Sequence, residues 1–311
     1  MISLLSGALL CAAVLLAGVA RGAPPARSAA GSAPCSLTRQ LAYVAANFPG
    51  KKAMVWLAAP NGSGRRRLFQ AATPALAPSG RLIAVTQFSG SAGLGIFTVC
   101  GSRLGQYFSS RDAISGIVWS PDSSLVAAIV KPHPNGSGTS ELVVFDVATG
   151  QLTTVATGYD FSGPSFSPTA PYSLTYAVAP TAEGGPIVWS AAIGQTSTQL
   201  TQASINYKPL WGPQGILYQH DSSSSSELEL LSNGHSTRLM NLSSWPVALS
   251  SDGLHLVAEN VACGAVFASS VNLATRKVVH QSRLASPPSA SPPRAVRCCS
   301  PERYRAAIAA S

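Results

Sequence analysis

Residues 119–130, WSPDSSLVAAIV, join a tryptophan, a Ser-Pro-Asp turn and an apolar run. Pro121 fixes its φ at about −65° and so favours a turn, in which Asp122 hydrogen bonds to the nearby backbone. The apolar residues that follow, Leu125 to Val130, are of the kind found in buried strands. One such stretch predicts only a turn that leads into a strand. Its recurrence along the chain decides the fold.

The same pattern occurs four more times, in ALAPSGRLIAV (75–85), SFSPTAPYSLTYAV (165–178), LWGPQGILYQ (210–219) and ALSSDGLHLVAE (248–259). The proline position of the five copies is spaced by 43, 47, 45 and 38 residues, at Pro78, Pro121, Pro168, Pro213 and Ser251. A large apolar residue precedes it by two positions in every copy: Leu76, Trp119, Phe166, Trp211 and Leu249. Each copy therefore predicts a hairpin, and the matching apolar residues predict packing between repeats.

A second strand–turn–strand unit lies between these hairpins, as in ELVVFDVATGQLTTVA (141–156). Six such outer hairpins can be identified, and LAYVAA (41–46) matches the second strand of a sixth inner hairpin that lacks its turn. Four antiparallel strands in each repeat are typical of a propeller blade, whereas a solenoid would have shorter and more uniform repeats. The sequence predicts an all-β fold, a six-bladed β-propeller of four-stranded antiparallel blades.

The Ser-Pro-Asp turn before a strand, followed by strand–turn–strand, resembles the WD-like repeat of TolB-type propellers. The resemblance covers about residues 40–280, and LAYVAANFPGKKAMVWLAAPNGSGRRRL looks like one outer half-blade of that family. It implies a propeller fold, and the family includes Tol-system proteins, peptidase-associated propellers and many uncharacterised exported chains. The turns depart from the family, since only Pro121-Asp122 keeps the Pro-Asp pair and Ser251 replaces the proline.

The two ends of the chain differ from its centre. Residues 1–22 hold an uncharged apolar run that predicts a signal peptide, with an N-terminal membrane anchor as the alternative, because the run has about the minimum length of a membrane span. Residues 23–34 are a predicted linker, 35–280 the propeller, and 281–311 a disordered, basic tail rich in Pro, Ser and Ala. We therefore expect an extracytoplasmic protein, either secreted, periplasmic or membrane-tethered.

The formal net charge of +9 is concentrated in those ends, because residues 35–280 carry only 14 basic and 11 acidic side chains. A nucleic-acid surface needs Lys and Arg gathered on one folded face, and only Arg65-Arg66-Arg67 forms a cluster. We expect no nucleic-acid partner, no membrane contact except through an uncleaved leader, and a monomer.

No catalytic motif is present. The sequence lacks a G-x-S-x-G elbow and a phosphate-binding loop, and its five histidines are scattered, without the spacing of a metal site. The position of Asp122 in a turn is explained by its hydrogen bonds to the turn backbone, without a role as a general acid. We therefore expect a non-catalytic protein without a cofactor or metal. The alternative is an exported hydrolase or lyase with an active site in the channel.

The loops that enter the innermost strands form one rim of a propeller, and they carry aromatic and charged residues. A channel mouth with such residues suits a protein or a cell-envelope ligand. The candidate binding residues are Arg111, Asp112, Tyr159, Asp160, Tyr207, Lys208 and Trp245.

The six cysteines form no CxxC pair, which is consistent with disulfides in an exported chain. Cys35 begins the predicted propeller and Cys263 lies in its last repeat. Because the two ends of a closed propeller meet, the two positions predict a Cys35–Cys263 disulfide beside the seam.

Overall fold

The structure is a computed structural model. It describes residues 41–45, 53–59, 61, 63–88, 91–108, 113–131, 138–202, 205–223, 225–241, 244–262 and 265–285. Every helix or strand element in these ranges is a β-strand, and all pairings are antiparallel, which confirms the predicted all-β class. The described part of the chain holds no helix that could span a lipid bilayer.

The strands form five hydrogen-bonded sheets in chain order. The first contains β1 (Leu41–Ala45), β2 (Met54–Ala58) and β3 (Arg66–Gln70). The second contains β4 (Ala72–Leu76), β5 (Leu82–Phe88), β6 (Ser91–Thr98) and β7 (Arg103–Tyr107). The third has seven strands: β8 (Ala113–Trp119), β9 (Leu125–Lys131), β10 (Ser140–Asp146), β11 (Leu152–Phe166), β12 (Ser173–Ala179), β13 (Ile187–Ala192) and β14 (Thr198–Gln199). The fourth contains β15 (Ile205–Gly212), β16 (Gly215–Asp221), β17 (Ser226–Ser232) and β18 (His235–Asn241). The fifth contains β19 (Trp245–Leu249), β20 (His255–Ala262), β21 (Ala265–Asn272) and β22 (Lys277–Ala285).

The seven-stranded sheet is two units joined by one long strand. The first half of β11, up to Gly158, pairs with β10, whereas the half from Tyr159 onward pairs with β12. Each half therefore closes a set of four strands, β8 to β11 and β11 to β14. The hairpins predicted from the repeat are all present, and residues 41–45 of LAYVAA form β1, which pairs with β2 as expected.

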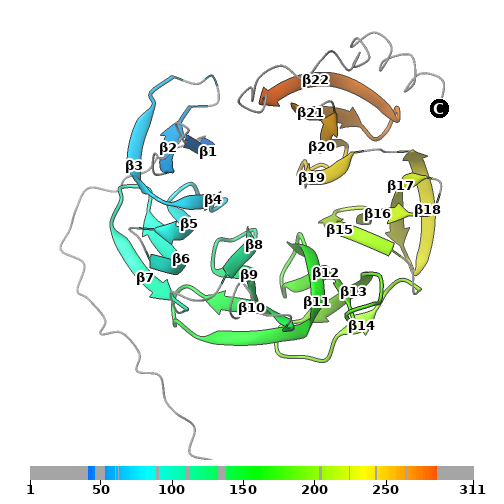
Figure 1. Ribbon diagram of the computed structural model, residues 1–311, viewed down its shortest axis with the longest axis horizontal. Coiled ribbons are helices and arrows are strands. Elements are labelled where there is room, and N and C mark those ends of the chain that lie inside the picture. The colour runs from blue at the N-terminus through cyan, green and yellow to red at the C-terminus, as the bar shows by residue number, and fades with distance from the viewer. Residues whose placement is uncertain are drawn as a thin grey trace, which may run out of the picture. The chain divides into compact units, whose positions relative to one another are not determined.

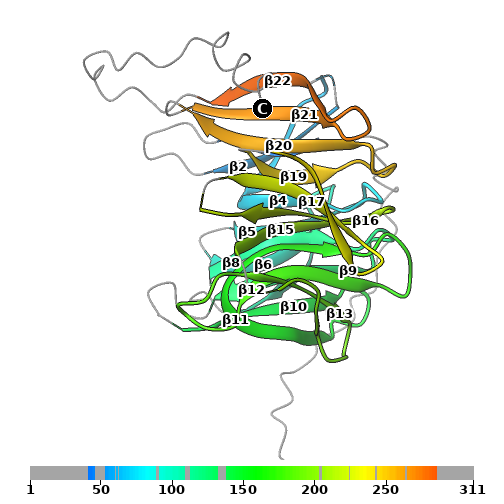
Figure 2. The same cartoon turned by 90° about the vertical axis from the view of Figure 1, so that its right-hand side faces the viewer.

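The sheets follow one another round a common centre, with the first strand of each nearest to it (Figure 1). The innermost strands β4, β8, β11, β15 and β19 contact one another in that order. Figure 2 shows the same sheets after a turn of 90°, so that sheets from the two sides of the centre overlap in the view. This arrangement places apolar faces of neighbouring sheets against each other, so the core is a series of layers between sheets.

Trp119 is the clearest residue of this core. It is 9% exposed and packs with Ala84, Leu94 and Ile96 of the preceding sheet. Its indole Nε1 donates a hydrogen bond to the Ala75 carbonyl of β4 at 2.8 Å. Trp211 occupies the matching position in β15 and contacts a cluster that includes Val188 of β13. The prediction that both tryptophans pack between repeats is confirmed.

The inner turns repeat one set of hydrogen bonds. The Ser120 hydroxyl accepts from the Leu125 amide at 2.9 Å, and Ser167 and Ser250 do the same for residues Ser173 and His255. Asp122 Oδ1 accepts from the Ser124 amide and from the Ser120 hydroxyl, at 3.0 and 2.7 Å. Burial alone would raise the pKa of Asp122, but these hydrogen bonds outweigh it and the pKa is lowered. Asp122 is thus a turn former, as predicted.

A repeated bulge in the innermost strands could not be seen in the sequence. Each innermost strand shifts its register near one position, which lies five residues before the proline position of the following turn. This holds for β4, β8, β11, β15 and β19. Four of these residues have a left-handed backbone: Thr73 (φ 45°), Gly116 (59°), Gly163 (56°) and Lys208 (46°). The fifth is Pro246, and a proline cannot adopt this backbone conformation.

Several predictions concern the ends of the chain. The last strand continues to Ala285, beyond the end predicted at residue 280. The predicted signal peptide, the linker, both cysteines of the predicted disulfide (Cys35 and Cys263), and residues 286–311 of the tail lie outside the described residues. Cys100, which follows β6, forms a disulfide.

Candidate functional site

The described candidate residues lie on three neighbouring innermost strands. Tyr159 and Asp160 are in β11, Tyr207 and Lys208 are in β15, and Trp245 begins β19. Because β15 contacts both β11 and β19, the fold brings the three strands side by side. Arg111 and Asp112 lie outside the described residues.

Lys208 and Trp245 meet directly. The Lys208 ammonium lies 4.7 Å from the centroid of the Trp245 ring, which is a cation–π contact. The bulge of β15 positions this lysine, because its left-handed backbone lies where the register shifts and its amide donates to the Ser162 hydroxyl at 3.2 Å. A non-glycine residue held in this region of backbone space indicates a constraint imposed by the surrounding structure.

Tyr207 lies among acidic residues. Burial is the largest cause that raises the pKa of its phenol, and the negative charges of Asp160 and Asp221 raise it further. Asp160, at a second left-handed position of β11, is exposed, whereas Tyr207 and Tyr159 are half-buried. Tyr159 stands opposite Ala179 in the ladder. The structure therefore groups Tyr207 with Asp160 and Lys208 with Trp245.

Sequence reasoning missed two residues beside this group. Asp221 ends β16 opposite Ile205, and its Oδ1 accepts a hydrogen bond from Gln219 Nε2 at 2.8 Å. Gln219 is 2% exposed, and its carbonyl oxygen has no hydrogen-bond partner in the described structure. The adjacent His220-Asp221 pair was the only signal for this position, and the register of β15 on β16 was needed to place it.

Apolar side chains are exposed near the same residues. Trp245 is 48% exposed, Val247 of β19 is 47% exposed and Ile205 of β15 is 43% exposed. Exposed aromatic and aliphatic side chains beside charged ones are typical of protein-binding surfaces. We call Ile205, Tyr207, Lys208, Trp245 and Val247 the inner-strand surface.

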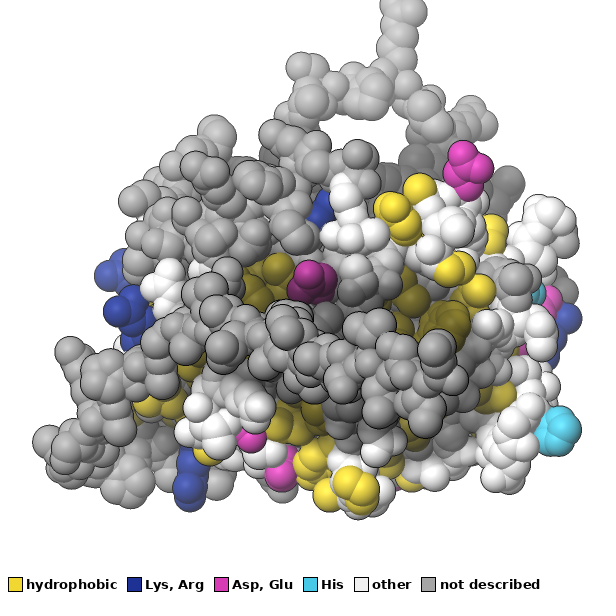
Figure 3. Space-filling model, turned by 90° about the horizontal axis from the view of Figure 1, so that it is seen from below, with side chains coloured by type: hydrophobic (Ala, Val, Ile, Leu, Met, Phe, Trp, Pro, Cys, Tyr) yellow, Lys and Arg dark blue, Asp and Glu magenta, His cyan; other side chains and the backbone are white. Residues whose placement is uncertain are grey.

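Figure 3 shows the molecule from below. Where side chains are described on this face, the Lys and Arg side chains lie in separate places and do not form one continuous patch. Among the described residues, no group of three or more His, Cys, Asp or Glu side chains could hold a metal ion.

The chain matches no protein-family model, and no curated protein is significantly similar to it. Its fold is similar to TolB from Acinetobacter baumannii, at 17% identity and a TM-score of 0.59, over 78% of this chain and 63% of that chain. An oligogalacturonate lyase in complex with manganese is 13% identical, with a TM-score of 0.59 over 79% of this chain and 74% of that one. Acylaminoacyl peptidase from Pyrococcus horikoshii is 13% identical, with a TM-score of 0.57 over 75% of this chain and 43% of that one.

These similarities show a TolB-like β-propeller fold, which confirms the resemblance drawn from the repeated turn. The chain spans less than two thirds of the A. baumannii TolB and less than half of the peptidase. Since the similar structures include TolB, a lyase and a peptidase, the fold is compatible with both binding and catalysis.

Proposed function

We propose that the protein is an exported, non-catalytic, six-bladed β-propeller that binds a protein or cell-envelope ligand through its channel rim. Six blades follow if the seven-stranded sheet counts as two units that share β11 and if the β1–β3 sheet is the incomplete first blade. The apolar leader at residues 1–22 supports an extracytoplasmic location.

The contact between Lys208 and Trp245 is the observation that carries the proposed binding role. A half-exposed tryptophan held by a lysine from the next strand is a large, rigid and partly apolar surface. Aromatic residues of this kind supply most of the binding energy at protein interfaces, and surrounding charges orient the partner. Tyr207, which precedes Lys208 in β15, and Asp160, whose charge acts on Tyr207, add a phenol and a carboxylate.

A photo-crosslinking amino acid at position 245 tests the role in the producing cell. We expect one discrete adduct whose second component can be identified by mass spectrometry. The same amino acid at position 104 is the matched control, because Leu104 is 54% exposed on the outer strand β7. Equal adduct patterns from both positions would remove the inner-strand surface as the binding site.

The alternative is an exported hydrolase or lyase with an active site in the channel. A lyase and a peptidase among the similar structures make this alternative worth a direct test. Elemental analysis of the purified chain and turnover assays on oligosaccharides and acylated peptides would test it. Stoichiometric metal, or turnover that a single channel substitution abolishes, would favour the enzyme over the binding protein.

A further inference from the structure

A polar cavity lies between two neighbouring sheets, apart from the inner-strand surface. It has a volume of about 300 Å³, at the lower end of the range of ligand pockets. Residues 200–202, which come directly after β14 in the chain, form one wall. The other wall is the face of the β15–β18 sheet that carries Tyr218, His220 and Glu229. Leu200 and Leu231 are the apolar part of the lining.

The register of β16 on β17 builds the polar wall. Ile216 stands opposite Leu231, and Tyr218 stands opposite Glu229. The side chains on this face therefore change from apolar to polar along the two strands. Tyr218 is 3% exposed, and its phenol donates to the Glu229 carboxylate and contacts the Ser236 hydroxyl at 2.8 Å. Since its proton is used toward Glu229, the phenol accepts from Ser236. This chain of hydrogen bonds ends on a carboxylate.

A second chain of hydrogen bonds fixes the orientation of His220. Asn206, which is 1% exposed, donates from Nδ2 to the Thr201 hydroxyl at 3.0 Å. Its Oδ1 lies 2.9 Å from His220 Nδ1 and can only accept, so Nδ1 carries a proton. In the neutral imidazole, Nε2 is then an acceptor. The Thr201 hydroxyl, which also accepts from the Val188 amide at 3.1 Å, has its own proton to donate.

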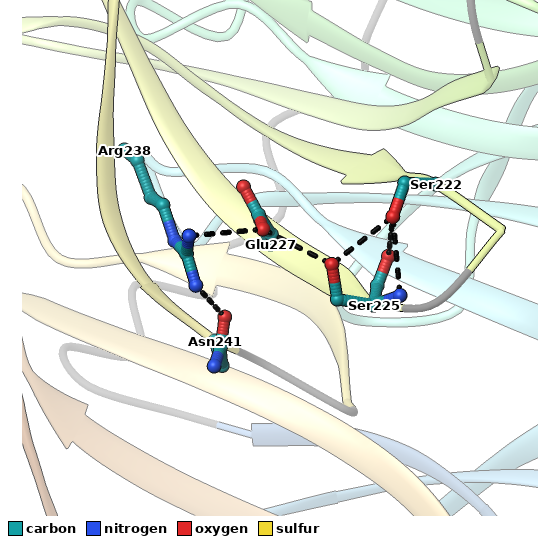
Figure 4. Close-up of polar contacts among 5 residues, drawn as sticks. All are labelled: Ser222, Ser225, Glu227, Arg238 and Asn241. Atoms are coloured by element: carbon teal, nitrogen blue, oxygen red, sulfur yellow. Dashed lines mark hydrogen bonds and ion pairs between the residues drawn. The ribbon is translucent and has the colours of Figure 1, made fainter. Parts of the chain in front are cut away.

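The cavity therefore offers the Glu229 carboxylate and His220 Nε2 as acceptors, beside the Thr201 hydroxyl as a donor. Arg238 stands opposite Glu229 in the ladder, but its guanidinium pairs with Glu227 at 3.2 Å and also donates to Asn241 (Figure 4). The Ser225 hydroxyl adds a hydrogen bond to the Glu227 carboxylate at 3.0 Å. Glu227 thus has an ion-pair partner, whereas within the described residues the Glu229 carboxylate is bonded by a neutral phenol.

We propose that this inter-sheet cavity binds a small organic cation that carries several N–H donors, with Glu229 as its counter-ion. Donors of a cation complement the carboxylate and the imidazole Nε2, and a charge-assisted hydrogen bond is stronger than a neutral one. Leu200 and Leu231 contact the apolar part of the ligand. This site is independent of the inner-strand surface, so either can fail alone.

Isothermal titration calorimetry of the full chain with ethylguanidinium and its neutral isostere ethylurea tests the site. We expect saturable, one-to-one binding of ethylguanidinium and at least about tenfold weaker binding of ethylurea, because only the first is charged. Glu229→Gln should weaken ethylguanidinium binding by at least about tenfold. Glu141→Gln on β10 is the control and should change it by less than about twofold, because this carboxylate does not line the cavity and its loss leaves the Glu227–Arg238 ion pair intact.

A second variant keeps the test decisive if Glu229→Gln does not fold. Ser236 is exposed at the lip of the cavity, so Ser236→Arg should fold and place a cation beside Tyr218 and Glu229. We expect it to abolish ethylguanidinium binding while Glu229 is intact. Absence of saturable binding to the unmodified protein, equal affinity for ethylurea, or unchanged binding in Ser236→Arg would overturn the proposal.

Discussion

Replacing Trp119 with Ala is expected to lower the free energy of unfolding by about 3–5 kcal/mol, the range for large aromatic residues in cores. The side chain is 9% exposed, and most of its neighbours lie in the preceding sheet. Its loss would leave a cavity between two sheets and remove the hydrogen bond to the Ala75 carbonyl. Chemical denaturation followed by circular dichroism measures the change.

Trp245→Ala is the matched control, because it removes the same side chain from an exposed position. Trp245 is 48% exposed and contacts Lys208, so its loss should lower the free energy of unfolding by about 1–2 kcal/mol, less than the loss of Trp119. A Trp119 variant as stable as the Trp245 variant would mean that the sheets do not pack as the structure has them.

Gly163→Ala is expected to destabilise the fold by about 2–4 kcal/mol, through backbone strain and a steric clash. Gly163 has a φ of +56°, and an added Cβ would lie 2.5 Å from the Lys208 Cα and 2.9 Å from its carbonyl carbon. These are backbone atoms of the next innermost strand, so β11 and β15 would have to separate. Denaturation midpoints measure the effect.

Gly194→Ala separates the two causes. Gly194 has a φ of +78°, but nothing lies within 4 Å of an added Cβ. Its replacement should therefore cost only the strain of a left-handed alanine, about 1 kcal/mol. If the two variants were equally stable, the close approach of β11 to β15 would be wrong.

The repeated turn allowed most of the strands to be predicted, because Ser-Pro-Asp chemistry and the apolar run after it are local signals. Ser120 and Asp122 form hydrogen bonds within their own turn, and every copy has a large apolar residue at the position of Trp119. The inner bulge was not predictable, because Thr73, Gly163, Lys208 and Pro246 share no residue type. They share a distance from the turn, and all except Pro246 share a left-handed backbone.

The contacts of the candidate sites depend on register and on neighbouring sheets. Lys208 and Trp245 were both predicted as rim residues, but their direct contact requires β15 and β19 to be adjacent. Tyr218, His220 and Glu229 each look like ordinary strand residues in the sequence. They line one cavity only because β16 pairs with β17 in one register and because residues 200–202, which follow β14 of the neighbouring sheet, cover them.

The most direct test of the proposed binding role is the affinity of the partner recovered by crosslinking for three forms of the protein. Titration of purified partner should show at least about tenfold weaker binding to Trp245→Ala than to the unmodified chain, the effect of an interface hot spot. Leu104→Ala should bind within about twofold of the unmodified chain, because Leu104 lies on an outer strand. Unchanged affinity of a folded Trp245→Ala variant would contradict binding through the inner-strand surface.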